Sequence, residues 1–516
     1  MGGERDRTGF GKLDLILLIL LAAAKFLVHF AVNAAGAYGF FRDEFYYIAC
    51  SERLAFGYVD HPPLSILLLK ISRLVLGDSL TAIRVLPAAA GALTVFLTGL
   101  IAKELGGGRF AWLFAALCVI LAPLHLGLNS YFSMNSFDIL IWTLAAYLII
   151  LWIQGRNPVW WMWLGVVLGM GLQNKISVLW LGFGLAAGLL LTENRRFILT
   201  RGPWLAAGIA GLIFLPYILW QVPNGWPTLR FMAGATGSKM LEVSFLQYVG
   251  TQVVEMNPVL LPVWFSGLDW YLFAREGRPY RMLGLIYLSV LALLVFSGNA
   301  RSFYLAAAYP MLFASGALVL ERVSAGPLTL YKRGALLGIT LAGGIAIAPM
   351  ALPVMPVEKY IAYSKALGVA PKTEERIEIG ALPQFFADMH GWEEIVASVA
   401  EVYRSLDVDD PGQWAVFVPN YGVAGAIDFL GRQYNLPAAI SGHNNYWLWG
   451  PGDPPPENLI ILGGRLDEYD ECCQVYQAGT TDCTYCMPYE DNVPIFVCRN
   501  LRVDPLKVWP GLRNFQ

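Results

Sequence analysis

The sequence predicts a mainly α-helical protein that crosses a membrane many times and ends in a smaller α/β domain. Of its 516 residues, 56% are hydrophobic and 14% are charged, whereas soluble globular proteins carry about 25% charged residues. Charged side chains number 41 in residues 1–355 and 33 in the shorter remainder, 356–516. We therefore expect a membrane domain over 1–355 and a water-exposed domain over 356–516.

Long apolar runs predict the membrane helices one by one. A helix rises 1.5 Å per residue and needs about 20 residues to cross the roughly 30 Å hydrocarbon core. About eleven segments show this pattern: 13–35, 82–102, 110–127, 137–153, 159–173, 176–192, 203–221, 257–273, 282–297, 303–320 and 334–352. We interpret the first as a retained helix because it is too long for a signal peptide and lacks a small-residue cleavage site.

The distribution of basic residues predicts the orientation. Lys and Arg in short loops stay preferentially in the cytoplasm. With the N-terminus inside, beginning with Arg5, Arg7 and Lys12, fifteen cations fall on the cytoplasmic side and nine on the other. An odd number of helices then places the C-terminal domain and the functional face outside the cytoplasm. The net charge of −2 offers no basic stripe for nucleic acid, so the expected partner is the lipid bilayer.

Five of the seven cysteines cluster in the C-terminal domain, at Cys472, Cys473, Cys483, Cys486 and Cys498. An oxidising compartment favours disulfides among them. Zinc is an alternative, since Cys483-x-x-Cys486 has ligand spacing, and free thiols are a third interpretation. An odd count leaves at least one thiol unpaired.

The loop between the first two predicted spans, about 37–80, is much longer than a connector requires, and such loops are usually functional. It begins with Asp43 and Glu44 near the outer end of the first span. The residues around them predict an amphipathic helix at the membrane surface, with an apolar face toward lipid that comprises Phe45, Ile48, Leu54 and Phe56. The two carboxylates either take part in chemistry or cap this helix.

Later in the same loop, Pro62 and Pro63 hold the chain extended at the start of the next helix and so orient Asp60 and His61. His61 can contact an anion or a hydroxyl group. A histidine that caps a turn is the alternative.

These segments resemble the GT-C glycosyltransferases. The runs DEFYYIACSERLAFGYVDHPPL (43–64) and GDSLTAIRVLP (77–87) are similar to the first outer loop of the bacterial branch (glycosyltransferase family 39) that is related to protein mannosyltransferases, to lipid A aminoarabinose transferase and to lipid A-core galacturonosyltransferases. Further similar segments, in the same order, are NSYFSMNSFDIL (129–140), GLQNKISVLWLG (171–182), NGWPTLRFM (224–232), NPVLLPVWFSGL (257–268) and ARSFYLAAAYPMLFASGA (300–317). The resemblance implies a GT-C fold with a catalytic first outer loop.

The resemblance also implies the chemistry. GT-C enzymes take a sugar from a polyprenyl phosphate, which agrees with the lack of a nucleotide-binding fingerprint in the sequence. The family's catalytic carboxylate corresponds to Asp43, with Glu44 as its neighbour, and His61 occupies a basic or polar family position. Inversion at the anomeric carbon requires such a base within about 3 Å of the acceptor hydroxyl.

The leaving phosphate gains negative charge, and nearby fixed cations stabilise it in the transition state. Lys175 and Arg301 lie in short outer loops and are the candidates, with snorkelling to lipid headgroups as the alternative. Asp138, like Asp60, is expected to face the substrate cavity, and Tyr304 either binds the phosphate or belongs to an interfacial aromatic belt. No cofactor is expected to be required, although a divalent cation is conceivable at Asp43, Glu44 and Asp138.

In the C-terminal domain, strands are predicted at 414–420, 458–464 and 494–500 and a helix at 423–434, a pattern typical of an α/β domain. His443, Asn444 and Trp447 suit either recognition of an acceptor sugar or a loop packed against the membrane domain.

We therefore expect a membrane hexosyl- or pentosyltransferase that acts on a lipid, glycan or protein acceptor at the outer face of the cytoplasmic membrane. A transporter or lipid flippase is the rival class, although the sequence lacks the paired broken helices of transporter repeats. A polytopic assembly factor, in which Asp43 has no chemical role, is a third interpretation.

Overall fold

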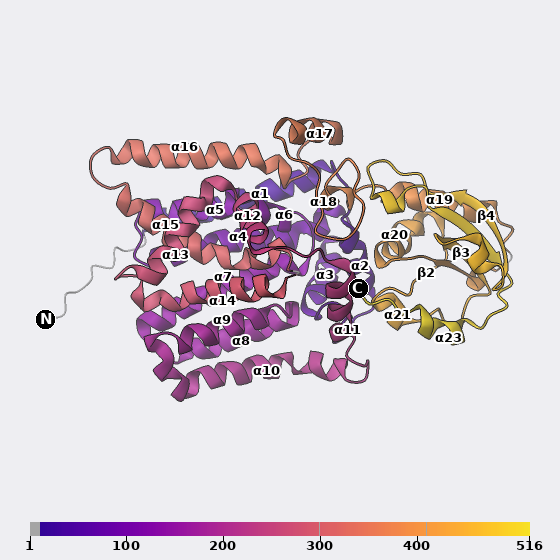
Figure 1. Cartoon of the computed structure of the whole chain (residues 1–516), viewed down its shortest axis with the longest axis horizontal. Coiled ribbons are helices and arrows are strands. Elements are labelled where there is room, and N and C mark those ends of the chain that lie inside the picture. Colours follow the sequence, from indigo (N-terminus) through magenta and orange to yellow (C-terminus); the bar gives the residue numbers. More distant parts are fainter. Residues whose placement is uncertain (1–10, 299, 409) are drawn as a thin grey trace.

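A computed structural model describes residues 11–298, 300–408 and 410–516. The long helices lie roughly parallel in a bundle, and the C-terminal sheet with its helices lies beyond one end of that bundle (Figure 1). The chain enters the bundle from the opposite end. Arg5 and Arg7, which contribute to the predicted orientation, lie outside the described residues.

Each predicted membrane segment overlaps a helix of the bundle. These helices are α1 (Lys12–Ala35), α4 (Leu80–Glu104), α5 (Arg109–Leu121), α7 (Met134–Gly155), α8 (Val159–Asn174), α9 (Val178–Leu190), α10 (Arg201–Gln221), α13 (Leu261–Phe273), α14 (Arg281–Ser297), α15 (Tyr309–Val323) and α16 (Thr329–Ile347). Among the described residues, seven helices are long and apolar enough to cross a membrane. The predicted span 110–127 is two helices, because Pro123 begins a separate short helix, α6 (Pro123–Leu128).

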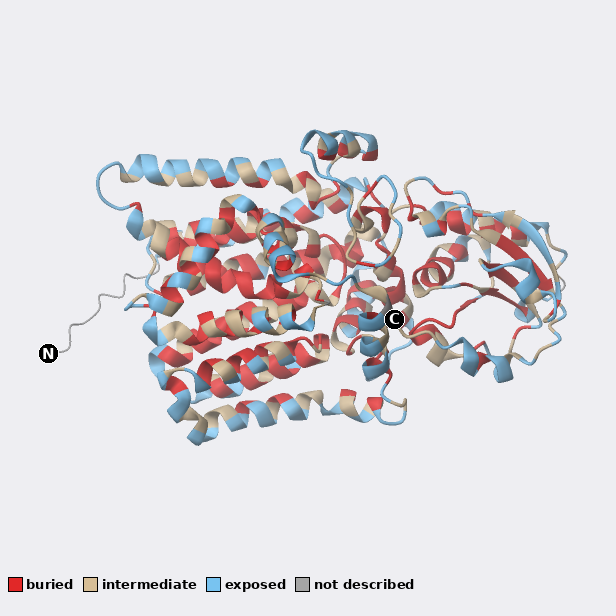
Figure 2. Ribbon diagram, viewed as in Figure 1, coloured by how far each residue is buried: buried red, intermediate tan, exposed pale blue. Residues whose placement is uncertain are grey.

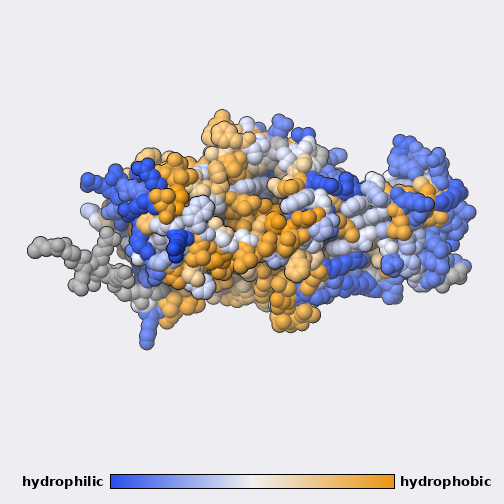
Figure 3. Space-filling model, turned by 90° about the horizontal axis from the view of Figure 1, so that it is seen from below, coloured by the Kyte–Doolittle hydropathy of each residue, from blue (hydrophilic) through white to orange (hydrophobic). Residues whose placement is uncertain are grey.

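The surface of the bundle is apolar, as a lipid-facing surface requires. Helices α1, α10 and α16 are the most exposed of these seven, since 17% of the most apolar stretch of each is buried. Helices α10 and α16 lie at opposite edges of the bundle and are mostly exposed or intermediate (Figure 2). Figure 3 shows an apolar belt over the bundle, bounded by a hydrophilic end on one side and by the hydrophilic C-terminal domain on the other. The apolar surface thus lies over the helix bundle and the hydrophilic surface over the C-terminal domain.

Shorter helices complete this part of the chain: α2 (Arg42–Glu52), α3 (Leu64–Leu76), α11 (Pro227–Gly234), α12 (Phe245–Glu255), α17 (Val357–Ala366) and α18 (Gln384–Ala387). Of these, α2, α3 and α11 lie at the end of the bundle that faces the C-terminal domain (Figure 1). Helix α3 exposes Leu67, Leu74 and Val75, as expected of a helix at a membrane surface.

The lipid-facing role predicted for α2 is wrong. Phe45 and Ile48 are fully buried, and only Leu54 and Phe56, beyond the helix, are exposed. Phe45 packs edge-on against Trp392 of the C-terminal domain at 5.5 Å. The amphipathic pattern is real, but its apolar face meets protein and not lipid.

The C-terminal domain contains a five-stranded sheet in the order β2-β1-β3-β5-β4. The strands are β1 (Trp414–Phe417), β2 (Ala439–Ile440), β3 (Asn458–Leu462), β4 (Gln474–Thr480) and β5 (Pro494–Arg499), and the helices are α19 (Trp392–Ser405), α20 (Tyr421–Leu430), α21 (Asn445–Trp449), α22 (Leu466–Tyr469) and α23 (Pro505–Val508). Strands β2, β1 and β3 are parallel, whereas β5 is antiparallel to β3 and β4. The three predicted strands and the predicted helix are confirmed. Strand β2 is too short, and β4 too exposed, for a clear sequence signal.

The first outer loop and the C-terminal domain share one hydrophobic core. Phe45 of α2 and Ile66 of α3 belong to the same buried cluster as Val396 of α19 and Val416 of β1. Conversely, Tyr360 and Phe386, which follow residue 355, pack into the core of the helix bundle. The carboxylate-bearing loop is thus fixed between the two parts of the molecule.

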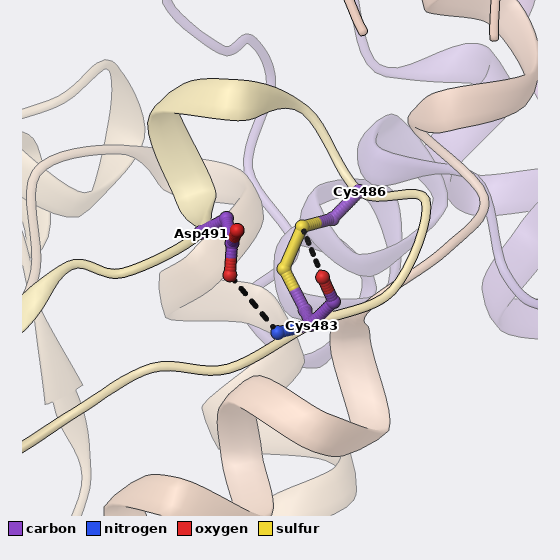
Figure 4. A group of neighbouring side chains, drawn as sticks. All are labelled: Cys483, Cys486 and Asp491. Carbon is purple, nitrogen blue, oxygen red and sulfur yellow. Dashed lines mark hydrogen bonds between the residues drawn. A yellow bond between two sulfur atoms is a disulfide. The ribbon is translucent and has the colours of Figure 1, made fainter. Parts of the chain in front are cut away.

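Two disulfides, Cys473–Cys498 and Cys483–Cys486, join four of the clustered cysteines, while Cys472, Cys50 and Cys118 are free. The potential ligand atoms of Cys483, Cys486 and Asp491 lie within 4.8 Å of one another, close enough to hold a metal ion. In Figure 4, however, the two sulfur atoms are bonded to each other, and Asp491 accepts a hydrogen bond from the backbone N–H of Cys483. Since zinc requires thiolates, the geometry favours the disulfide interpretation.

Candidate active site

Asp43 and Glu44 lie side by side in the first turn of α2 but have different environments. Glu44 is fully buried. Its carboxylate accepts hydrogen bonds from the guanidinium of Arg84 at 2.8 and 2.7 Å and from the backbone N–H groups of Phe41 and Phe132 at 2.8 and 2.7 Å. Four donors therefore hold Glu44, and through it α2, against α4 and the start of α7.

Asp43 is only half-buried. Its Oδ1 accepts a hydrogen bond of 2.9 Å from the hydroxyl of Tyr421, at the start of α20 in the C-terminal domain. Burial raises the pKa of the Asp43 carboxyl above its ordinary value, while Arg42, Lys239 and the Tyr421 hydroxyl oppose this shift. Asp43 is thus an oriented carboxylate with increased basicity and an open side.

Lys175, at the end of α8, binds the N-terminal end of α7. Its Nζ donates hydrogen bonds to Asn135 at 2.8 Å and to Asp138 at 3.3 Å. Lys175 also lies over the ring of Tyr304, 5.2 Å from the centroid. The structure therefore brings together three of the predicted site residues, Lys175, Asp138 and Tyr304.

Arg301 lies near this group, since Arg301 and Lys175 each lie 5.8 Å from the ring centroid of Phe303. Its guanidinium forms an ion pair with Glu375, from the chain that follows the last membrane helix. Lys239 lies 3.6 Å from the same carboxylate. Burial lowers the pKa of Lys239, and Glu375 opposes this shift. Lys175, Arg301 and Lys239 are thus linked into one group of cations, through the Phe303 ring and the Glu375 carboxylate.

Asp60 and His61 are adjacent in sequence but differ in exposure. Asp60 keeps 17% of its side chain exposed and accepts a hydrogen bond of 2.8 Å from the Tyr46 hydroxyl. The His61 side chain is fully buried, with its Nε2 3.9 Å from Asp60. Its ring lies among tyrosines, with centroids 4.9 Å from those of Tyr47 and Tyr58. The geometry places Asp60 at the surface of the site and His61 behind it.

The three residues predicted to recognise an acceptor lie in a packed loop. His443 Nε2 contacts the backbone oxygen of Gln516 at 2.9 Å, Asn444 is fully buried, and the Trp447 indole donates a 2.9 Å hydrogen bond to the backbone of Trp509. The His443 ring also lies 4.7 Å from that of Tyr421. This loop packs against the C-terminal residues and supports the tyrosine that contacts Asp43.

Several residues at the site escaped prediction because their partners are distant in sequence. Arg42 lies 3.6 Å from Asp388 and 4.0 Å from Glu490, both in the C-terminal part of the chain. Burial raises the pKa of Asp388 to about 6 and that of Glu490 to about 8. The sequence indicated Lys239 only as a cation in a predicted outer loop. It contained no local pattern that would have indicated Tyr421 or Glu375 as residues of the site.

The three carboxylates considered for a divalent cation do not form one ligand set. Glu44 is engaged by Arg84, Asp138 by Lys175 and Ser177, and Asp43 by Tyr421. Across the described parts of the chain, the group shown in Figure 4 is the one cluster whose potential ligand atoms lie close enough together to hold a metal ion.

A bundle of apolar helices, with a carboxylate-bearing loop between the bundle and a C-terminal α/β domain, is the architecture of an integral membrane protein, and its likeness to solved structures identifies the fold as GT-C. Among solved structures, the chain is similar to ArnT from Cupriavidus metallidurans bound to undecaprenyl phosphate, with a TM-score of 0.61 and 12% identity over 95% of this chain and 98% of that one. The apo state of that protein matches equally, with a TM-score of 0.61 and 13% identity over 96% and 99% of the chains.

Residues 60–220 match the family described as dolichyl-phosphate-mannose-protein mannosyltransferase. An oligosaccharyltransferase from Archaeoglobus fulgidus is more distant, with a TM-score of 0.48 and 12% identity over 80% of this chain and 63% of that chain. No curated protein matches the chain in sequence. The family match and the ArnT-like fold confirm the resemblance predicted from the motifs.

Proposed function

We propose that the protein is a membrane glycosyltransferase that moves one sugar from a polyprenyl-phosphate donor to a lipid, glycan or protein acceptor at the outer face of the cytoplasmic membrane. The observation that carries the proposal is the position of Asp43. This oriented, half-buried carboxylate of raised pKa lies at the end of an apolar bundle. The charges of Lys239 and Arg301 interact with it, and Lys175 shares the Phe303 ring with Arg301. The undecaprenyl phosphate bound by the similar ArnT structure supports the donor class.

In the proposed reaction, Asp43 accepts the proton of an acceptor hydroxyl as its oxygen attacks the anomeric carbon. The bond from that carbon to the phosphate oxygen breaks, and polyprenyl phosphate leaves from the opposite face, which inverts the configuration. Lys175 and Arg301, together with Lys239, stabilise the charge that develops on the leaving phosphate. Asp138 orients Lys175, and Tyr304 contacts the same phosphate.

The remaining predicted residues have positioning roles in this proposal. Glu44 fixes α2 through Arg84, so that Asp43 keeps its orientation. His61 supports Asp60, which lines the substrate side of the site, and the loop of His443, Asn444 and Trp447 supports Tyr421. The site uses no cofactor, and a chelator is expected to leave turnover unchanged. Turnover that a chelator abolishes and Mg²⁺ or Mn²⁺ restores would show that a cation takes part.

The test is turnover in reconstituted membranes. Wild type and Asp43→Asn are incubated with a panel of radiolabelled polyprenyl-phosphate pentoses, hexoses and uronic acids, with and without membrane lipid extract, and release of polyprenyl phosphate is followed. We expect Asp43→Asn to lose at least about 10²-fold in turnover, the lower range for a general base, with donor binding intact. Asp467→Asn, at an exposed ion pair, is the matched control.

Two results would contradict the proposal. Turnover that Asp43→Asn leaves unchanged would exclude Asp43 as the base. Failure of every donor in the panel to bind the wild-type protein would exclude this donor class and favour the transporter or flippase interpretation.

A further inference from the structure

A cavity of about 300 Å³ lies between the C-terminal half of α2 and the C-terminal domain. Ile48, Ala49 and Glu52 of α2 form one wall, and residues 425–438 form the opposite wall. Trp449, at the end of α21, closes one side. The volume is at the lower end of the range of small-molecule sites, about 300–1,000 Å³.

The cavity is separate from the site around Asp43. Residues of a helix turn by about 100° and rise by 1.5 Å each. Glu52 follows Asp43 by nine residues, so it projects from the opposite side of α2 and lies about 14 Å further along its axis. Tyr46 and Tyr47 share the face of Asp43, whereas Ile48 and Glu52 line the cavity. The part of a ligand that occupies this cavity therefore cannot also contact Asp43, the proposed base.

The charges around the cavity balance. Two carboxylates, Glu52 and Asp428, and two guanidinium groups, Arg53 and Arg432, line it. Arg432 lies 3.8 Å from Glu52, and Asp428 accepts a hydrogen bond of 2.7 Å from the Tyr446 hydroxyl. A simple anion would meet both carboxylates and a simple cation both guanidinium groups. The cavity therefore suits a neutral ligand that has both donors and acceptors.

One pair of planar side chains points to the kind of neutral ligand. The guanidinium of Arg53 lies over the ring of Trp449, 4.4 Å from its centroid. No carboxylate lies within ion-pair distance of Arg53 in the described part of the chain. A sugar ring combines an apolar C–H face, which stacks on an indole, with hydroxyl groups that both donate and accept. Guanidinium and carboxylate groups together satisfy such hydroxyls.

The rim of the cavity lies against helix α3. Glu52 forms ion pairs with Lys70 at 3.1 Å and with Arg73 at 2.7 Å. Both cations belong to α3, whose exposed apolar residues face lipid. A glycan that enters this cavity therefore lies next to the helix whose exposed apolar residues suit a membrane surface.

We propose that this cavity binds a sugar residue of a glycolipid, and that this glycolipid is the acceptor of the transferase. The second half of the proposal rests on the proposed function, whereas sugar binding in the cavity does not. The bound sugar is remote from the acceptor hydroxyl that Asp43 deprotonates, so the cavity selects the acceptor and does not take part in the chemistry.

The first experiment measures binding without turnover. Full-length protein in detergent is mixed with millimolar methyl glycosides of a pentose and hexose panel, and with sodium phosphate as an anion probe, and saturation-transfer NMR is recorded. We expect transfer to at least one glycoside, weakened at least tenfold by Trp449→Ala and by Arg53→Gln. Arg499→Gln, which removes a similar Arg–Trp contact on the sheet (5.3 Å), should leave it unchanged, as should Asp43→Asn.

The second experiment measures kinetics with membrane lipid extract as the acceptor. Arg53→Gln should raise the KM for the extract at least tenfold and leave kcat unchanged. Arg53 is exposed, so this variant is expected to fold even if Trp449→Ala does not.

Three outcomes would overturn the inference: no transfer to any glycoside, transfer that both cavity variants leave unchanged, or binding of phosphate alone. These results are distinct from failure of the proposed function, since sugar binding that depends on Arg53 remains measurable in a protein that turns over no donor. Turnover without sugar binding would refute only the cavity.

Discussion

The Tyr421 hydroxyl donates a hydrogen bond of 2.9 Å to the Asp43 carboxylate, across 378 residues of sequence. Tyr421 begins helix α20 of the C-terminal domain, and Asp43 lies in the first turn of α2, at the end of the bundle that faces this domain. The C-terminal domain therefore completes the candidate active site and does not only cover it.

The first prediction concerns this bond. Tyr421→Phe should lower kcat/KM about 10- to 100-fold, because a hydrogen bond to a charged group contributes about 1.5–3 kcal/mol. The hydroxyl lowers the pKa of Asp43, so its loss raises that pKa, and the acid limb of the kcat/KM profile should move to higher pH. A pH–rate series on wild type and Tyr421→Phe measures this shift, with the exposed Tyr476→Phe as the control. An unchanged acid limb would show that the bond does not tune Asp43.

The second prediction concerns the cations. Lys175→Met should lower kcat by about 10²- to 10³-fold, the effect of removing one fixed donor that stabilises developing charge. Lys175→Arg, which keeps the charge, should retain more activity than Lys175→Met. The exposed Lys507→Met serves as the control. Equal donor turnover in Lys175→Met and wild type would remove Lys175 from the proposed phosphate site.

The third prediction separates structure from chemistry at Glu44. Removing one partner of a buried ion pair costs about 3–5 kcal/mol, so Glu44→Gln and Arg84→Met should each reduce the free energy of unfolding by about that amount. Thermal unfolding in detergent, with the 82% exposed Glu242→Gln as the control, measures the loss. If Glu44→Gln were as stable as wild type yet inactive, Glu44 would belong to the chemistry.

The fourth prediction concerns stability against pH. Burial raises the pKa of Glu490 from 4.5 to about 8 in the folded protein, so the folded state binds this proton more tightly than the unfolded state. The associated stability is present below the unfolded pKa and is lost as pH rises through the folded pKa. The Tm of wild type should therefore fall between about pH 5 and pH 8, and Glu490→Gln should flatten that slope. The same slope in both proteins would contradict the raised pKa.

Much of the fold could be predicted from sequence because lipid imposes a strong, local requirement on composition. The helix that contains Asp138 and the strands at 414–420 and 458–464 each carry their own apolar signal. The lipid-facing role of Phe45 was wrong for the same reason, since an apolar face shows that a surface is buried but not whether lipid or protein buries it.

The candidate site was predicted in part. The motifs identified Asp43, Lys175 and Asp138 from residue type and order, and the structure brings Lys175 and Asp138 together. Partners such as Tyr421, Glu375 and Glu490 could not be found, because a side chain becomes a partner only when folding brings distant segments within hydrogen-bond reach.

The sequence by itself determined that this chain is a polytopic membrane protein with a polar C-terminal domain, and it placed a carboxylate pair on the first outer loop. Both follow from local composition and spacing. Only the tertiary structure decided how the two carboxylates differ: Arg84 and two backbone N–H groups bind Glu44, while a tyrosine from the other end of the chain orients Asp43. The physical reason is that burial, hydrogen bonding and pKa depend on neighbours in space, and here those neighbours come from segments up to 378 residues apart.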